Sequence, residues 1–274
     1  MKSFLNAYRF LNIISIDVAC GAVVCAAFFA DILMIKLKTY GFASLGMTVW
    51  IIYTIDHLLD AGRLKNQAST ERHRFHQKYY KLLSRIVILA IFIDLYMIFH
   101  VRKAIFDKGL ALSFVVLIYL LLQKWISPFK EVVAALLYTC GIVLPAFSLY
   151  SGILPVSSIL LMISFAITAF INLILFSMFD VDKDISHTQS SIVILIGKRN
   201  TSFFLMFLFF AQGILFFYLA MKGNNFMEII VLLVMNVVLI ILFVFSEQFK
   251  GGDRYRLIGD AIFLLPLPYL ILNG

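Results

Sequence analysis

The stretch FSMFDVDKDIS, residues 176–186, ends a long apolar run with Asp180 and Asp184 four residues apart. On an α-helix this spacing puts both carboxylates on one face, about 40° apart and roughly 6 Å from each other. Asp182 falls about 160° away if the helix continues, so we expect it to be solvated. The pair can hold one end of a hydrated Mg²⁺ that carries a diphosphate, because Mg²⁺ prefers oxygen ligands and keeps several waters.

A second stretch repeats this spacing earlier in the chain. YTIDHLLDAGR, residues 53–63, carries Asp56 and Asp60 at the end of another apolar run. The chain has fifteen acidic residues among 274, and the two pairs use four of them. We therefore predict that all four aspartates bind Mg²⁺ and take part in the chemistry of a diphosphate.

The composition predicts an integral membrane protein. Hydrophobic residues make up 62% of the chain and charged residues 14%, with a mean hydropathy of +0.99, whereas the apolar share of a soluble domain is roughly 45 to 50%. Residues 1–274 are expected to form a single all-α membrane domain of nine transmembrane helices. The apolar runs lie near residues 9–34, 41–59, 84–101, 132–150, 153–179, 202–221, 226–246 and 257–272, with a shorter ninth near 109–122.

Basic residues are distributed unevenly between the two sides of this topology. Of the 23 Lys and Arg residues, seventeen fall on the side of the N terminus and six on the other. This bias predicts a cytoplasmic N terminus in a bacterial inner membrane. The net charge of +8 is therefore mainly topological, and we expect a lipid bilayer rather than a nucleic acid as the partner.

The two acidic pairs end the second and sixth predicted helices, which run in the same direction. Both pairs therefore face the cytoplasm. They also open the two longest connections, roughly 61–82 and 183–201, which hold most of the polar side chains. We expect one cytoplasmic polar cap over two facing acidic clusters. Four basic residues are the nearest candidates to neutralise a leaving diphosphate: Arg72, Arg74, Lys124 and Lys183.

The second acidic pair opens a segment that resembles a motif of the UbiA superfamily of intramembrane prenyltransferases. Family members commonly read Asp-x-x-x-Asp, a few residues including Gly, then Thr-Leu-Pro-Val and a Gly followed by basic residues. Here DVDKDISHTQSSIVILIGKR runs from Asp180 without a gap to the Gly-Lys-Arg at 197–199. Ser191 and Ile192 stand where Thr and Leu are usual, and Val193 replaces the Pro.

Two further family motifs are matched in part. The first motif usually reads Asn-Asp-x-x-Asp-x-x-x-Asp; Asp56 and Asp60 match its last two acids, whereas Ile52 and Tyr53 occupy the leading positions. The family's Tyr-x-x-x-Lys-Arg at the end of the fourth helix is similar to YLLLQKW. There Tyr119 and Lys124 match, and Gln123 takes the place of Lys.

The resemblance implies a nine-helix UbiA-like bundle that moves a prenyl group from a polyprenyl diphosphate to an acceptor. It implies Mg²⁺ as the cofactor, and Tyr119 and the basic residues named above as substrate-binding groups. The acceptor stays open among an aromatic acid, a tetrapyrrole and a lipid-linked alcohol. Cyclisation or hydrolysis of the same diphosphate, without an acceptor, is a related outcome.

Two other classes of function stay open. An ion-coupled transporter could use Asp17, Asp94 and Asp260 as a proton path, although structural hydrogen bonding is the alternative role for each of these acids. A non-catalytic relative could keep the fold to bind an isoprenoid lipid. Asp260 closely follows Arg254 and Arg256, and we expect it to pair with one of them.

Overall fold

The computed structural model describes residues 2–63, 70–127, 129–186, 190–223 and 225–273, and the regular elements in these ranges are helices. The first half forms α1 (Lys2–Ile13), α2 (Ile16–Ile32), α3 (Thr39–Arg63), α4 (Glu71–Lys78), α5 (Tyr80–Ile98), α6 (Lys103–Ile126) and α7 (Lys130–Leu149). The second half forms α8 (Val156–Ser186), α9 (Ile192–Met221), α10 (Phe226–Val244), α11 (Ser246–Phe249), α12 (Arg254–Ala261) and α13 (Pro266–Asn273). Two 3₁₀ turns, η1 (Gly251–Asp253) and η2 (Ile262–Leu264), flank α12.

Seven helical segments of the described chain are long and apolar enough to cross a membrane: α3, α6, α7, α8, α9, α10 and the segment from η1 to α13. The bent pair α1 and α2 makes an eighth if it counts as one span. Helix α5 has 19 residues but carries Lys81, Arg85 and Asp94. The chain is therefore an all-helical integral membrane protein, and a helix lies at each of the nine predicted runs.

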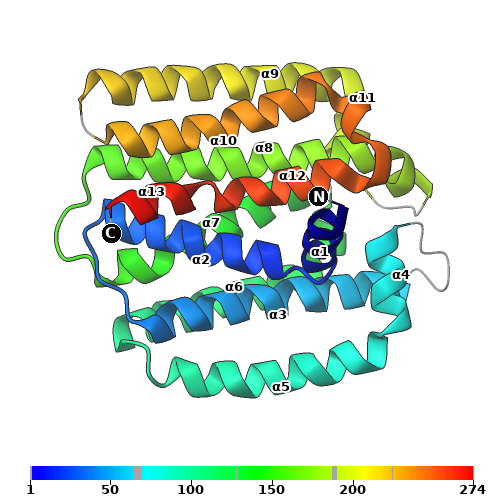
Figure 1. Cartoon of the computed structure of the whole chain (residues 1–274), viewed down its shortest axis with the longest axis horizontal. Helices are drawn as coiled ribbons and strands as arrows, with labels where there is room; N and C mark the ends of the chain where they lie inside the picture. Colours follow the sequence, from blue (N-terminus) through cyan, green and yellow to red (C-terminus); the bar gives the residue numbers. More distant parts are fainter. Residues whose placement is uncertain (1, 64–69, 128, 187–189, 224, 274) are drawn as a thin grey trace.

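The first apolar run is not one continuous helix, which differs from the prediction. Helices α1 and α2 meet at 82°, because Ser15 adopts a left-handed backbone with φ of 59°. The indole N–H of Trp50 donates to the carbonyl of Ile14 at 2.9 Å and so satisfies a backbone group at the break. Helix α1 consequently lies across one end of the bundle, at the same end as α4 (Figure 1).

The spanning helices form a bundle with α8 near its centre. Helix α8 packs against α7, α9 and α10, while α2 packs against both α3 and α7. The main apolar core joins these helices to α12 and η2. Helix α5 lies at the opposite edge from α9 (Figure 1) and packs on α3 around a smaller apolar cluster.

A buried polar network joins α8, α9 and α10. The amide of Gln212 accepts a hydrogen bond from Ser164 at 2.7 Å and donates to Thr168 at 3.0 Å. Asn236 of α10 donates to the same Thr168 hydroxyl at 2.9 Å. Because polar groups in an apolar medium require internal partners, this network fixes the register of the three helices.

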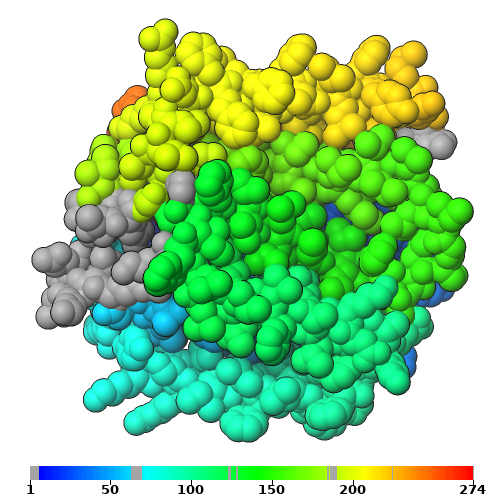
Figure 2. Space-filling view, turned by 180° about the vertical axis from the view of Figure 1, so that it is seen from behind, coloured from blue at the N-terminus to red at the C-terminus, as the bar shows by residue number. Residues whose placement is uncertain are grey.

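The outer faces of several helices carry large apolar side chains toward the lipid. Exposed examples on α5, α6 and α9 include Phe92, Leu110, Phe114, Phe207 and Phe210. Figure 2 shows this side of the molecule, with α6 and α7 between the yellow-green helices of the second half and α5. Such a surface is stable only in a bilayer.

Helix α12 approaches α8 closely at Gly259. A Cβ atom on Gly259 would come within 2.5 Å of both Asn172 Oδ1 and the ring of Phe176. We expect Gly259→Ala to destabilise the protein by about 1–3 kcal/mol, because the added methyl group overpacks the contact between the two helices. Thermal unfolding in detergent measures the effect.

The matched control is Gly213→Ala in α9, where a Cβ atom would have no heavy atom of another residue within 4 Å beyond its own stretch of helix. That substitution should be neutral or slightly stabilising, because Ala has the higher helix propensity. Equal melting temperatures for the two variants would contradict the close packing of α12 on α8.

Candidate functional site

A cavity of about 1240 Å³ runs among α3, α5, α6, α7, α8 and α12. Its polar end lies beneath α4 and is lined by carboxylates from α3 and α8 and by cationic side chains from α4, α8 and α12. The remainder is mostly apolar and reaches the opposite ends of α3 and α5, at Gly41 and Ile98. The cavity therefore combines a charged end with an apolar interior.

The cavity brings together most of the predicted site residues that the structure describes: Asp56, Asp60, Arg72, Tyr119, Asp180 and Lys183. Arg74 is exposed on α4 and does not line the cavity. The side chains of Lys124 and Asp184 lie outside the described part of the chain, although both positions are helical. The predicted convergence of the two motifs thus rests on Asp56, Asp60 and Asp180.

Asp56 and Asp60 occupy the last turns of α3, where both are half-buried at the cavity wall. Their spacing of four residues places them on one helix face, as the sequence predicted. Tyr119 of α6 lies within electrostatic range of both carboxylates and of Glu131 on α7. Three helices therefore contribute to this side of the polar end.

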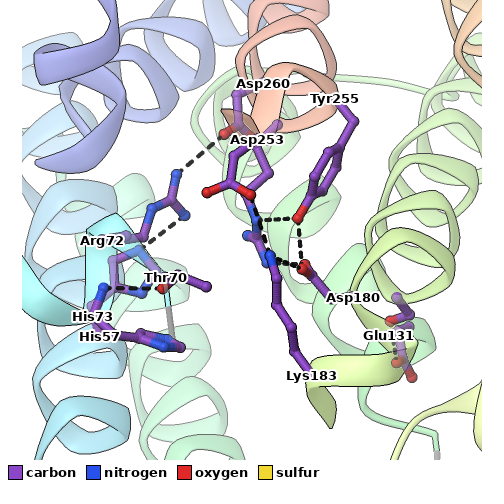
Figure 3. Close-up of polar contacts among 12 residues, drawn as sticks. His57, Thr70, Arg72, His73, Glu131, Asp180, Lys183, Asp253, Tyr255 and Asp260 are labelled. Carbon is purple, nitrogen blue, oxygen red and sulfur yellow. Dashed lines mark hydrogen bonds and ion pairs between the residues drawn. The ribbon is translucent and has the colours of Figure 1, made fainter. Parts of the chain in front are cut away.

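Asp180 lies opposite, on α8, in a dense set of ionic contacts (Figure 3). Its carboxylate accepts hydrogen bonds from the hydroxyl of Tyr255 at 2.6 Å and from Lys183 Nζ at 2.9 Å, and it forms an ion pair with Arg256. Lys183 also pairs with Asp253 at 3.2 Å. The C-terminal part of the chain thus supplies three of the groups around this aspartate.

Arg72 of α4 links both ends of the chain to the cavity. Its guanidinium donates to the Asn12 side-chain oxygen at 2.9 Å and forms an ion pair with Asp260 at 3.7 Å. The Asn12 amide in turn donates to Asp17 at 2.6 Å and to Asp260 at 2.7 Å. Asp260 therefore pairs with Arg72, and the expected pairing with Arg254 or Arg256 is wrong.

Helix α4 begins at a capped turn, in which the Thr70 hydroxyl accepts from the backbone N–H of His73 at 3.2 Å. Three contacts hold it over the cavity: Arg9 with Glu71 at 3.2 Å, the Phe10 ring edge-on to Phe75 at 5.9 Å, and the Gln77 amide to the Ala61 carbonyl at 3.0 Å. The helix thus forms a fixed cap between α1 and α3.

The guanidinium groups of Arg72 and Arg256 influence each other across the polar end. Burial lowers the pKa of Arg72, and the positive charge of Arg256 lowers it further. In Figure 3, Arg72 lies on the left and the Asp180 cluster on the right, with Asp253 between them in this view; Arg72, Asp180 and Asp253 all line the cavity. An anion with several oxygens between the two guanidinium groups would reduce their repulsion and accept hydrogen bonds from both.

Tyr255 and Arg256 were not predicted from the sequence to belong to this site. Local sequence patterns could not predict the contacts of Tyr255 and Arg256, because their partner, Asp180, lies 75 or more residues away in the chain. Glu131 is buried on α7, with one oxygen accepting from Ser177 at 2.7 Å and the other without a hydrogen-bond partner in the described structure. An acid at the start of an apolar run was the only available signal for Glu131.

Comparisons with known proteins now bear on this arrangement. The chain matches no protein-family model and no curated protein sequence. Solved structures do match over nearly the whole chain. A UbiA homologue from Aeropyrum pernix superposes with a TM-score of 0.71 at 13% identity, over 94% of this chain and 98% of that one. The chain has the UbiA fold.

Two other structures with this fold support the same conclusion. A UbiA homologue from Archaeoglobus fulgidus bound to GPP and Mg²⁺ has a TM-score of 0.67 at 12% identity, over 96% of this chain and 99% of that one. A digeranylgeranylglyceryl phosphate synthase has a TM-score of 0.58 at 11% identity, over 99% and 98%. The UbiA fold expected from the motif spacing is thereby confirmed.

The ion pair between Asp180 and Arg256 generates a stability prediction. Removing one partner leaves the other charge uncompensated, so the destabilisations caused by Asp180→Asn and by Arg256→Gln should add up to more than the destabilisation of the double variant. We expect a coupling energy between about 0.5 and 3 kcal/mol in a double-mutant cycle measured by thermal unfolding. The exposed pair Asp182 and Lys198, at 3.4 Å, is the control and should couple by no more than about 1 kcal/mol. Equal coupling in the two cycles would contradict the stronger coupling expected of a partly buried pair.

The cap helix generates a pH prediction through His76. Burial lowers the pKa of His76, so the folded cap holds a neutral ring while the unfolded ring binds its proton near a pKa of about 6.5. The cap therefore loses stability as the pH falls below that value. Hydrogen exchange of residues 71–78, corrected for the chemical exchange rate, should accelerate between about pH 7.5 and about pH 5.5.

His76→Gln should reduce this pH dependence, since glutamine does not titrate; any remainder would come from His57, whose ring lies 5.1 Å from that of His76. His100→Gln, at an exposed position between α5 and α6, serves as the matched control and should leave it intact. An unchanged pH profile in His76→Gln would assign the effect to another group.

Proposed function

We propose that this protein is an Mg²⁺-dependent prenyltransferase that moves a polyprenyl group from its diphosphate to an acceptor. The observation that supports this best is the single cavity in which Asp56, Asp60 and Asp180 share one end with Arg72, Lys183 and Arg256. The apolar interior of the same cavity suits a prenyl chain. The structures with the same fold include one bound to GPP and Mg²⁺.

The donor set at the polar end fits Mg²⁺. Mg²⁺ commonly binds through one or two carboxylates together with waters and substrate phosphates, rather than in a cage made wholly of protein groups. Asp56 and Asp60 supply two such carboxylates on one wall of the cavity. Among the described residues, no three His, Cys, Asp or Glu side chains are close enough to hold a metal alone, so phosphate oxygens would complete the site.

The cationic side chains at the polar end stabilise the negative charge of the leaving diphosphate. Mg²⁺, when bound, neutralises part of the charge on the diphosphate. Arg72 and Lys183 donate hydrogen bonds to the leaving diphosphate as the allylic C–O bond breaks and its electron pair passes to oxygen. Arg256 serves as a third cation, although its present partner is Asp180.

The developing allylic cation needs a dry and electron-rich surrounding. The cavity provides ring faces near its polar end from Tyr53, Tyr119, Tyr138 and Phe176, and such faces stabilise positive charge. The α4 cap limits the access of water from above. The acceptor, from one of the three classes given above, then attacks the allylic carbon, and the proton that it loses passes to the released diphosphate or to water.

The finer topology is part of the same proposal. We infer nine spans, with α5 counted as one despite its three charged residues, and a cytoplasmic location for α4 and both acidic motifs in a bacterial inner membrane. The positive-inside distribution of Lys and Arg supports this orientation. The proposed substrate-binding set keeps Tyr119 and Lys124; Lys124 and Asp184 enter from the motif match alone, and Arg74 would act at the surface of the cap.

The positions of the buried acids argue against the transporter and leave the non-catalytic relative as a second candidate. The proton path of a transporter required Asp17, Asp94 and Asp260 to form one route, but Asp17 and Asp260 meet at Asn12 whereas Asp94 binds Ser44 and Thr48. A non-catalytic, isoprenoid-binding relative is a second candidate, favoured by the pairing of Asp180 with Arg256 and by the incomplete first motif.

Release of inorganic diphosphate tests the proposal. Purified protein in nanodiscs, given Mg²⁺ and polyprenyl diphosphates of several lengths with a mixture of the three acceptor classes, should release diphosphate. Asp56→Asn and Asp180→Asn should each lower the rate by about a hundredfold or more, because each removes a carboxylate that would hold the Mg²⁺ which neutralises the diphosphate. Asp182→Asn is the matched control, since Asp182 lies in the same motif but is exposed and paired with Lys198.

The two possible failures have different meanings. Binding of a non-hydrolysable diphosphate analogue with Mg²⁺, but without turnover in any mixture, would favour the non-catalytic relative. Absence of binding as well as turnover would overturn the diphosphate site itself.

A further inference from the structure

A second polar group lies deep in the cavity, away from the charged end. Asp94 of α5 is only 6% exposed, and it lines the cavity together with Ser44 and Thr48 of α3. The two hydroxyls donate to separate oxygens of the carboxylate, each at 2.7 Å. These three residues are called the Asp94 cluster below.

The Asp94 cluster and the charged end lie at different depths. Thr48 and Ser44 precede Asp56 by eight and twelve residues on α3, which corresponds to about 12 to 18 Å along the helix axis. The cavity wall between the two levels is mostly apolar, with the hydroxyl groups of Ser113 and Tyr138 as exceptions. It includes Val49, Ile52, Val116, Leu120, Ala134 and Leu137. The cavity thus has polar groups at two levels and a mostly apolar middle.

Among the described residues, the carboxylate of Asp94 is bound by hydroxyl groups alone. In the part of the chain that the structure describes, Ser44 and Thr48 are its hydrogen-bond partners and no ion pair involves it. Each carboxylate oxygen has two lone pairs, so one hydroxyl per oxygen leaves capacity to accept further hydrogen bonds. An acid at this depth is costly unless it is paired, and it marks a functional position.

A purely structural role would account for only part of this arrangement. Packing α5 against α3 requires the two hydroxyl contacts, but it does not require the carboxylate to face a cavity. A plain hydrocarbon chain passing Asp94 would leave its remaining lone pairs unsatisfied. A ligand with a hydrogen-bond donor at that level would satisfy them.

We propose that the Asp94 cluster is a second binding subsite, which accepts a hydrogen bond from a hydroxyl or ammonium group at the far end of an elongated apolar ligand. The apolar chain fills the middle of the cavity. The inference rests on the proposed diphosphate site when that ligand is the prenyl donor. An acceptor with a long chain and a distal hydroxyl is the other source of the same chemistry.

The donor form is tested by comparing two probes, farnesyl diphosphate and ω-hydroxyfarnesyl diphosphate, by titration calorimetry with Mg²⁺. Wild-type protein should bind the hydroxylated probe about tenfold more tightly, as expected for one hydrogen bond to a charged group. Asp94→Leu should abolish this preference without weakening the binding of farnesyl diphosphate. Asp94→Asn keeps the size; its amide oxygen can accept from one of the two hydroxyls and its amide nitrogen can donate to the other. It should therefore reduce the preference with little change in melting temperature even if Asp94→Leu does not fold.

The acceptor form is tested with chains that lack a diphosphate, dodecanol and dodecane-α,ω-diol. Selective thermal stabilisation by the diol, lost in the Asp94 variants, would assign the subsite to a neutral acceptor chain. The diol arm also keeps the two proposals distinguishable, because failure of farnesyl diphosphate to bind would overturn only the diphosphate site. Equal responses to paired probes in both arms would reduce the Asp94 cluster to a helix contact and overturn the inference.

Discussion

Two arginines, Arg72 and Arg256, set the arrangement of the polar end, because a guanidinium group stays charged and must be matched where it is buried. Arg72 is matched by Asp260 and Asn12, and Arg256 by Asp180. These contacts join a short cap helix, the N-terminal helix and the last membrane segment around one space. Asp56 and Asp60 on α3 can reach a ligand shared with Asp180 because these pairings hold the opposite wall of the cavity in place.

The cavity owes its shape to a division among the helices. Helix α5 packs on α3, and α6 packs on α7, so the cavity lies between two helix pairs rather than inside one tightly packed core. The second half of the bundle behaves differently, since the network around Thr168 and Gln212 draws α8, α9 and α10 together. Helices α9 and α10 therefore pack behind α8, and α8 presents Asp180 and Lys183 to the cavity between the helix pairs.

Local patterns in the sequence predicted the features that depend on local geometry. The four-residue spacing placed Asp56 and Asp60 on one face of α3, and the apolar runs located the helices. Contacts between distant segments could not be obtained this way: the hydrophobic pattern gives no sign that Arg72 meets Asp260, or that Tyr255 and Arg256 surround Asp180. The bend at Ser15 was also missed, because it depends on a left-handed residue and on a tertiary bond from Trp50.

The long-range partners of the cap helix have a consequence for biosynthesis. Arg72 leaves the ribosome long before Asp260, because 188 residues separate them in the sequence, and chains fold progressively as they are made. During that interval α1, α3 and α5 can hold the cap, and Asn12 can bind the guanidinium of Arg72, but its carboxylate partner Asp260 is missing. The polar end is completed when the final helices insert, and an incomplete chain that already holds both aspartate motifs would still lack it.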